Sequence, residues 1–133
     1  MRHIEPLLGE IAAHGLSFEG FHLFAGSQNL NAESICEAQL KSYELALRLA
    51  DAAPAPVRFL NLGGGLGIPY FPGERPLDLQ PISANLADLA SRASRQMPGA
   101  SLVIELGRYL VGEAGIYVTR VVDRKVSRGT TFL

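Results

Sequence analysis

Three apolar stretches of this sequence each lead into residues that can bind a charged ligand. These residues are Ser27 after stretch 21–24, Gly63, Gly64 and Gly65 after stretch 57–62, and Glu105 and Arg108 after stretch 102–104. In a parallel α/β protein the carboxyl ends of neighbouring strands open at one edge of the sheet, where ligands bind. A hydroxyl, a glycine turn, a carboxylate and a guanidinium would meet there. Such a set suits a phosphorylated ring that carries a basic nitrogen.

The triple glycine would let backbone N–H groups approach an anion, because no side chain lies in the way. The alternative is a tight turn that is rich in glycine for no functional reason. A dinucleotide-binding fingerprint fits poorly, since it needs glycine or alanine where the sequence has Ile68. The lysine of a nucleotide phosphate loop is also missing, since Lys41 and Lys125 are both distant in sequence. We therefore expect the three glycines to bind a phosphate group.

The third stretch ends in a carboxylate that has to be paired, because a charge at the end of a buried strand loses its hydration. Glu105 would pair with a protonated ring nitrogen, and Arg108 would turn back to form charge-assisted hydrogen bonds with a phosphate. The alternative is an ion pair between Glu105 and Arg108 themselves. The nearby glycines favour the interpretation as a ligand site.

Four residues around the first stretch are more ambiguous. Ser27 either donates its hydroxyl to phosphate or caps the following helix. Phe24 either lies against a flat ring or belongs to the core. His22, on the same strand face as Phe24, is expected to be structural. Cys36 falls on the packed side of a helix and is expected to be inert.

The composition bounds the class of protein. A chain of 133 residues with 47% hydrophobic content is expected to fold as one modest domain. The net charge of −1 argues against a protein that coats nucleic acid or an anionic membrane. No apolar run reaches the length of a membrane span and no signal peptide opens the chain, so we expect a cytoplasmic protein. With Cys36 as the single cysteine, an internal disulfide and a cysteine-cluster metal site are excluded, and no metal is expected.

Apolar periodicity predicts three strand–helix repeats at a spacing of roughly 40 residues. The predicted strands are 18–24, 57–62, 101–104 and 116–126. The first helix is predicted over 3–14, the second after an N-cap at Asn31, and the third from Pro81. The predicted buried faces are Cys36, Leu40, Tyr43, Leu47 and Ala50 on the second helix and Ile82, Leu86, Leu89 and Ala93 on the third. The proline-rich segment 66–80 is long for an α/β connection and is interpreted as a lid or active-site loop.

Three such units are too few for an eight-fold barrel, which needs about 250 residues. The chain is therefore expected to be either a small open α/β sheet or the later part of a barrel. A helical pattern begins almost at Met1 and the last predicted strand comes close to Leu133, so both ends look like cuts within a larger protein.

Three motifs in this order resemble the fold-type III pyridoxal-phosphate decarboxylases, the ornithine/diaminopimelate decarboxylase group. Residues 20–28 are similar to the motif of its sixth barrel strand, residues 60–70 to the glycine motif after strand seven, and residues 105–111 to the Glu-Pro-Gly-Arg motif of strand eight. The resemblance implies a partial (β/α)8 TIM-type barrel, the last three βα units, over residues 1–115. Residues 116–133 would begin a C-terminal β domain.

The resemblance also implies a cofactor, pyridoxal 5′-phosphate, and a role for each site residue. Glu105 would keep the pyridine nitrogen protonated, so that the ring acts as an electron sink. The phosphate would be bound by Gly63, Gly64, Gly65, Arg108 and Ser27. Phe24 stands where ornithine and diaminopimelate decarboxylases usually carry a histidine stacked on the ring. Leu106 replaces the proline of the motif, a change expected to alter little chemistry.

The phenylalanine points away from standard ornithine or diaminopimelate specificity. The form Phe-Ala-Gly-Ser-Gln-Asn is more similar to the subgroup linked to exosortase and exopolysaccharide gene clusters or to carrier-protein-linked decarboxylation. The implied substrate is a small or carrier-linked amino acid, and the implied full-length enzyme is a homodimer. The Schiff-base lysine of the family is absent from this chain, so this part alone is expected to contain no catalytic residue and to be inactive. A racemase-like enzyme of the same fold type and a non-catalytic α/β module for a phosphorylated ligand remain as alternatives.

Overall fold

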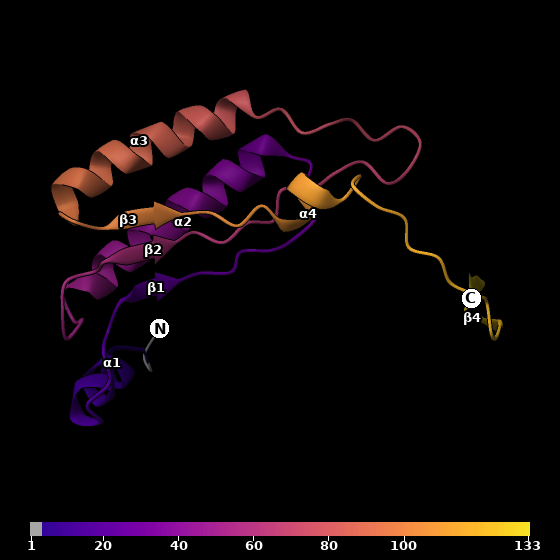
Figure 1. Ribbon diagram of the computed structural model, residues 1–133. Coiled ribbons are helices and arrows are strands. Elements are labelled where there is room, and N and C mark those ends of the chain that lie inside the picture. Colours follow the sequence, from indigo (N-terminus) through magenta and orange to yellow (C-terminus); the bar gives the residue numbers. More distant parts are fainter. Residues whose placement is uncertain (1–3) are drawn as a thin grey trace.

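The computed structural model describes residues 4–133 as a layer of helices packed on a small parallel sheet (Figure 1). In chain order the elements are α1 (Ile4–Ala13), β1 (Gly20–His22), α2 (Ala32–Ala50), β2 (Phe59–Asn61), α3 (Gln80–Gln96), β3 (Ser101–Val103), α4 (Gly107–Val111), β4 (Lys125–Ser127) and β5 (Thr130–Phe132). The alternation of strand and helix, and hence the α/β class, is confirmed. Residue 3, the predicted first position of the first helix, lies outside the described residues.

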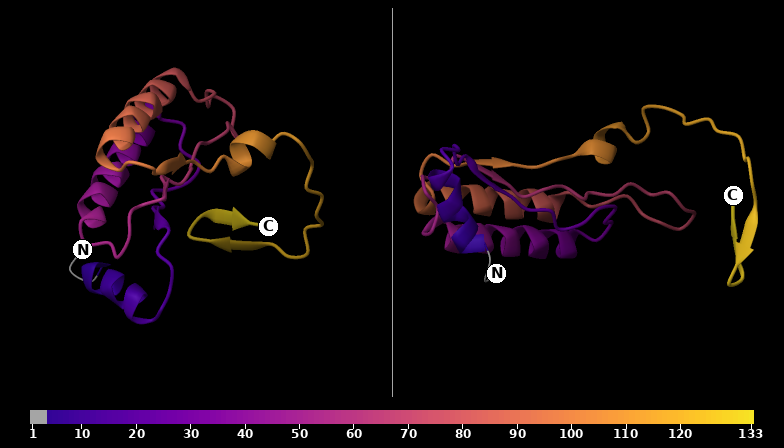
Figure 2. Two further views of the ribbon diagram at one scale, coloured as in Figure 1. Left: turned by 60° about the vertical axis from the view of Figure 1, so that its left-hand side comes forward. Right: turned by 90° about the horizontal axis from the view of Figure 1, so that it is seen from below.

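The sheet has the order β1-β2-β3, and both pairs are parallel. His22, Asn61 and Val103 are in register across the three strands. Both α2 and α3 lie on the same side of these strands (Figure 2). We call the opposite side the open face. Residues that alternate toward the helices enter the core, whereas those that alternate the other way are presented on the open face.

The main core lies between the sheet and the two long helices. Tyr43 of α2, Leu60 of β2 and Leu89 of α3 are the largest fully buried side chains. On α3 the predicted face is confirmed, because Ile82, Leu89 and Ala93 are buried and Leu86 packs beside them. These contacts hold α2 and α3 against the strands whose carboxyl ends form the site.

The predicted face of α2 is confirmed at Tyr43, and its other four residues pack against the core, but the centre of the buried stripe lies about one residue away from the prediction. The buried residues are Ile35, Gln39, Ser42, Tyr43, Ala46 and Leu49, whereas the predicted Cys36, Leu40, Leu47 and Ala50 are only half-buried. The stripe contains two polar residues, which a search for apolar periodicity does not select. Gln39 is accommodated because its side-chain oxygen accepts a hydrogen bond of 2.8 Å from the Asn85 amide of α3.

The predicted helix boundaries are close to those observed. Asn31 caps α2 by accepting a 2.9 Å hydrogen bond from the backbone N–H of Ser34. Pro81 lies in the first turn of α3, where its missing N–H has no partner to lose. Gly15, with φ of 66°, follows the end of α1. The connection from residue 62 to residue 79 contains no helix or regular strand, in agreement with the prediction of a long loop.

The strand predicted over 116–126 is wrong. Only residues 125–127 form a strand, which pairs antiparallel with 130–132 in a two-stranded hairpin away from the parallel sheet (Figures 1 and 2). Ile116 is 91% exposed and its neighbours are similarly open. Alternating apolar residues form a strand only beside a partner, and nothing in residues 4–133 pairs with residues 116–122. Within the described residues, no helix has the length and apolarity to cross a bilayer.

Cys36 is expected to react slowly with an alkylating reagent. Burial raises the pKa of its thiol, a backbone hydrogen bond opposes this change, and the charge of Glu33 adds to the increase. Because the thiolate is the nucleophile, iodoacetamide at pH 8 should modify Cys36 severalfold more slowly in the folded chain than in urea. Mass spectrometry over time measures both rates. Equal rates in the two states would show that packing does not suppress this thiol.

Candidate functional site

The carboxyl ends of the three parallel strands converge on one side of the molecule. A cavity of about 140 Å³ lies there, lined from all three strand ends by Phe24, Gly26, Ser27, Gln28, Gly64, Gly65, Leu66, Glu105, Leu106, Gly107 and Arg108. The glycine turn and the carboxylate of Glu105 are therefore at the same end of the sheet. This convergence is what a ligand with both an anionic group and a ring nitrogen requires.

The glycine turn, residues 63–65, is packed against the backbone of both neighbouring segments. A Cβ atom would lie 2.6 Å from the Leu23 carbonyl oxygen at Gly63 and 2.6 Å from that of Gly26 at Gly65, and at Gly64 it would overlap the carbonyl of Glu105. The fold itself therefore requires glycine at all three positions. The same geometry leaves the N–H groups of Gly64 and Gly65 without a backbone acceptor among residues 4–133, so both can donate to an anion.

Pairing of the first two strands continues beyond the glycine turn. A parallel bridge joins Asn29 to Leu66, with the Asn29 N–H donating to the Gly65 carbonyl at 2.8 Å. On the other side, the Glu105 N–H donates to the Gly63 carbonyl at 2.8 Å. The turn is thus fixed between two segments that carry site residues.

Glu105 is half-exposed and is held by two residues of the open face. The side-chain amide of Asn61 donates a hydrogen bond of 2.9 Å to its Oε1. Nε2 of His22 lies 3.5 Å from the same oxygen, a contact that becomes an ion pair when the imidazole is protonated. The carboxylate can therefore accept a further hydrogen bond from a ligand at Oε2.

Arg108 is oriented by partners other than Glu105. Its Nη1 donates to Oε1 of Gln28 at 3.0 Å and lies 3.5 Å from the hydroxyl of Tyr70, whose ring it also faces. Among residues 4–133 no ion pair joins Glu105 to Arg108. The alternative of an ion pair between Glu105 and Arg108 is therefore wrong.

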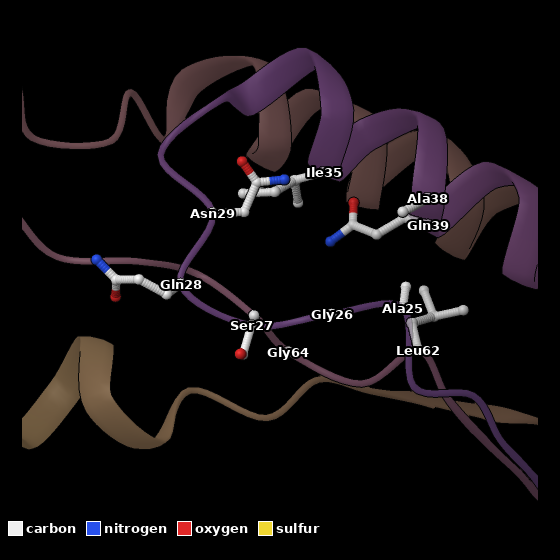
Figure 3. Close-up of a pocket in the computed structure, with 11 residues that line it drawn as sticks. Ala25, Gly26, Ser27, Gln28, Asn29, Ile35, Ala38, Gln39, Leu62 and Gly64 are labelled. Atoms are coloured by element: carbon white, nitrogen blue, oxygen red, sulfur yellow. The ribbon is translucent and has the colours of Figure 1, made fainter. Parts of the chain in front are cut away.

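Ser27 does not cap α2 and Phe24 does not belong to the core, so both remain available to the site. The cap of α2 is Asn31, so the Ser27 hydroxyl is free of that task. Figure 3 shows this hydroxyl pointing away from α2, toward the segment that leads to α4. Phe24 is 75% exposed on the open face and is not a core residue. Both line the cavity with Glu105 and Arg108.

A second cavity of about 280 Å³ lies on the helix side of the same loop (Figure 3). Ile35, Ala38 and Gln39 of α2 line it together with residues 25–29. It is larger than the first cavity but contains no charged side chain. The acid and the guanidinium are both on the other side of the loop.

Sequence reasoning missed four residues of this arrangement, namely His22, Asn61, Gln28 and Tyr70. His22 was expected to be purely structural, but its alternation with Phe24 places it on the open face beside Glu105. Asn61 interrupts an apolar strand, which is a signal that could have been used, since asparagine is depleted in strands. The partners of Arg108 come from loops, where periodicity gives no information.

Neither lysine of the chain approaches the cavity. Lys41 forms an ion pair with Glu37 on the exposed side of α2, one turn away. Lys125 lies in the C-terminal hairpin, over the ring of Phe132. In the described residues, no cluster of three or more histidine, cysteine or acidic side chains could hold a metal ion.

Comparison with known proteins shows the family to which this α/β chain belongs. Residues 2–112 match the family described as pyridoxal-dependent decarboxylase, pyridoxal binding domain. The chain belongs to this family. The expected resemblance to the pyridoxal-phosphate decarboxylases is thus confirmed, and pyridoxal phosphate is the cofactor of these domains.

Relatives of this decarboxylase domain include two of the predicted kinds. The chain is 38% identical over 117 residues to the L-glutamyl-[BtrI acyl-carrier protein] decarboxylase of Niallia circulans, covering 87% of this chain and 27% of that protein. It is 38% identical over 109 residues to the diaminopimelate decarboxylase of Thermoplasma acidophilum, covering 82% of this chain and 26% of that protein. The chain therefore spans about a quarter of the length of these relatives.

A solved structure supports the fold of the decarboxylase domain. The crystal structure of diaminopimelate decarboxylase from M. jannaschi aligns with a TM-score of 0.57 at 20% identity, over 74% of this chain and 23% of that chain. The common α/β arrangement with a parallel sheet is therefore shared at low sequence similarity.

Proposed function

We propose that this domain binds the phosphate and the pyridine nitrogen of pyridoxal 5′-phosphate in an amino-acid decarboxylase. One observation carries the proposal: a carboxylate, a guanidinium, a hydroxyl and two glycines whose N–H groups have no backbone acceptor among residues 4–133 line a single cavity beside an exposed phenyl ring. Pyridoxal 5′-phosphate, when bound, supplies an electron sink for the carbanion formed when CO₂ is lost.

Each residue of the cavity has a stated task in this proposal. Arg108, already oriented by Gln28, neutralises the phosphate, while Ser27 and the glycine turn donate hydrogen bonds to it. Glu105 accepts a hydrogen bond from the ring nitrogen and favours its protonated form. Phe24 provides an apolar surface for the cofactor ring, and its phenyl side chain cannot transfer a proton.

The architecture proposed for the parent enzyme is an eight-stranded barrel, of which this chain forms the last three βα units. Residues 1–115 belong to that barrel, and residues 116–133 begin a C-terminal β domain. In a barrel the open face of the sheet becomes the interior, so His22 and Asn61 would face the barrel axis.

The proposed substrate is a small or carrier-linked amino acid, and the proposed assembly is a homodimer. Because neither lysine is near the cavity, we propose that the lysine carrying the cofactor comes from elsewhere and that this chain alone does not decarboxylate.

Replacing Arg108 with methionine tests the phosphate part of the site. Pyridoxamine 5′-phosphate is the suitable probe, because it has no aldehyde and forms no adduct with surface lysines. Arg108→Met is expected to weaken its binding about tenfold, the loss of a charge-assisted hydrogen bond, and to leave binding of unphosphorylated pyridoxamine unchanged. Ring fluorescence measures both affinities.

Arg95→Met is the matched control, because Arg95 lies on the exposed side of α3, donates a hydrogen bond to Ser91 and does not line the site cavity. It should leave both affinities unchanged. If Arg108→Met weakened both ligands equally, or neither, the guanidinium would not be a phosphate ligand and the proposal would lose its anion site.

A further inference from the structure

One side chain is bonded at once to the glycine turn and to the acid of the site. The oxygen of the Asn61 amide accepts a 2.8 Å hydrogen bond from the N–H of Gly63, and its nitrogen donates the 2.9 Å bond to Oε1 of Glu105. An amide has one acceptor end and one donor end, and only one orientation satisfies both contacts. We call these two hydrogen bonds the Asn61 bridge.

We infer that Asn61 is a positioning residue, which fixes the pyridine-binding acid relative to the phosphate-binding turn. The inference rests on the proposed function, because Asn61 acts only through the glycine turn and Glu105. It goes beyond the proposed function because Asn61 itself contacts neither the phosphate nor the ring nitrogen in that proposal.

The position of Asn61 in the chain supports this inference independently. It lies on the central strand, between the buried Leu60 and Leu62, where the fold alone would favour a β-branched or other apolar residue. A local choice that contradicts strand propensity is expected at functional sites, where another requirement outweighs it. The bridge supplies that requirement.

The bridge also determines which oxygen of Glu105 is available. Both Asn61 and His22 contact Oε1, so the contacts of the described chain leave Oε2 for a ligand. Without the amide, the half-exposed carboxylate could rotate about its side-chain bonds, and its hydrogen bond to a ring nitrogen would require ordering of the side chain at each binding event. The expected consequence is a loss specific to ligands that carry a ring nitrogen.

The test compares two ligands on the full chain. One is pyridoxamine 5′-phosphate and the other is its carbocyclic analogue, in which C–H replaces the ring nitrogen. Asn61→Ser retains a short oxygen that can accept from the Gly63 N–H but cannot reach Glu105. We expect Asn61→Ser to weaken pyridoxamine 5′-phosphate about tenfold, the cost of ordering the Glu105 side chain on binding, and to leave the carbocyclic analogue unchanged.

Asn61→Ala removes both halves of the bridge and should weaken both ligands, the nitrogen-containing one more. Adding Asn61→Ser to Glu105→Gln should produce no further difference between the ligands, because the carboxylate that the amide orients is no longer there to pair with the ring nitrogen. The ¹⁵N shift of the labelled ring nitrogen, followed over pH, should show easier deprotonation in Asn61→Ser than in the wild-type complex. A residue with a purely structural task would not move this signal. Asn85→Ala, which loses an amide contact between α2 and α3, controls for general loss of stability.

The outcomes separate the inference from the function on which it rests. If wild-type protein bound the two ligands equally well, and Glu105→Gln changed nothing, the proposed function and the inference would both fail. If Glu105→Gln discriminated between the ligands but Asn61→Ser did not, only the inference would be overturned.

Discussion

Replacing Gly64 with alanine is expected to lower the free energy of unfolding by about 3 kcal/mol, at the upper end of the usual cost of overpacking. The added Cβ would overlap the carbonyl oxygen of Glu105 and would lie 3.3 Å from its Cβ, so β2 and β3 would have to separate where the site is built. A main-chain atom cannot move aside as a flexible side chain can. Urea denaturation followed by circular dichroism measures the change.

Two other glycines serve as matched controls for this substitution. Gly107 lies at the start of α4 beside the same cavity, and Gly9 lies within α1; a Cβ at either position meets nothing within 4 Å. Gly107→Ala should be nearly neutral, and Gly9→Ala should stabilise the chain by about 0.5–1 kcal/mol, because alanine is favoured inside a helix. A Gly64→Ala chain as stable as wild type would mean that the close approach to Glu105 is not a feature of the folded protein.

Glu105→Gln is expected to reduce the affinity for pyridoxamine 5′-phosphate about tenfold, since a neutral amide cannot balance a protonated ring nitrogen. The loss should be greatest where the ring nitrogen of the free ligand is protonated while the carboxyl of the wild-type protein is ionised, and should diminish as the pH rises and the ring becomes neutral. The partial exposure of Glu105 keeps the expected effect below that of a fully buried ion pair. Fluorescence titrations at several pH values measure it.

Glu113→Gln is the comparison for that variant, because Glu113 is an exposed acid just after α4 that does not line the site cavity. It changes the net charge of the chain by the same amount. Its affinity for the ligand should match that of wild type at every pH. If both variants lost the same affinity, the effect of Glu105 would come from the net charge of the chain at long range. That result would contradict a direct contact between Glu105 and the ring.

The parallel sheet and the convergence of its strand ends followed from the sequence because they depend on local signals. Apolar strands before Ser27, the glycine turn and Glu105 recur at an interval that only a strand–helix–strand connection spans, and such connections place successive strand ends at one edge. The cap at Asn31 and the proline at the start of α3 were predictable for the same reason. The two helix signals involve neighbours within a few residues, and the sheet follows from the regular repetition of such local signals.

Features that depend on contacts between distant segments were not predictable in the same way. The buried face of α2 includes Gln39 because Asn85, 46 residues away, supplies its hydrogen bond. The segment 116–122 has the alternation of a strand but no partner to pair with. The links from Asn61 to Glu105 and from Gln28 to Arg108 span 44 and 80 residues, and a single sequence gives no measure of such distances.

The parallel backbone pairing of Asn29 with Leu66 has a consequence for the entropy of ligand binding. Because main-chain hydrogen bonds hold the glycine turn on both sides, the loops proposed to bind the phosphate are held in place by the fold itself. Association then involves little freezing of the polypeptide, and the unfavourable entropy is confined to the small molecule and a few side chains. Calorimetry should accordingly record a smaller entropic penalty here than for a protein whose anion-binding loop folds around its guest.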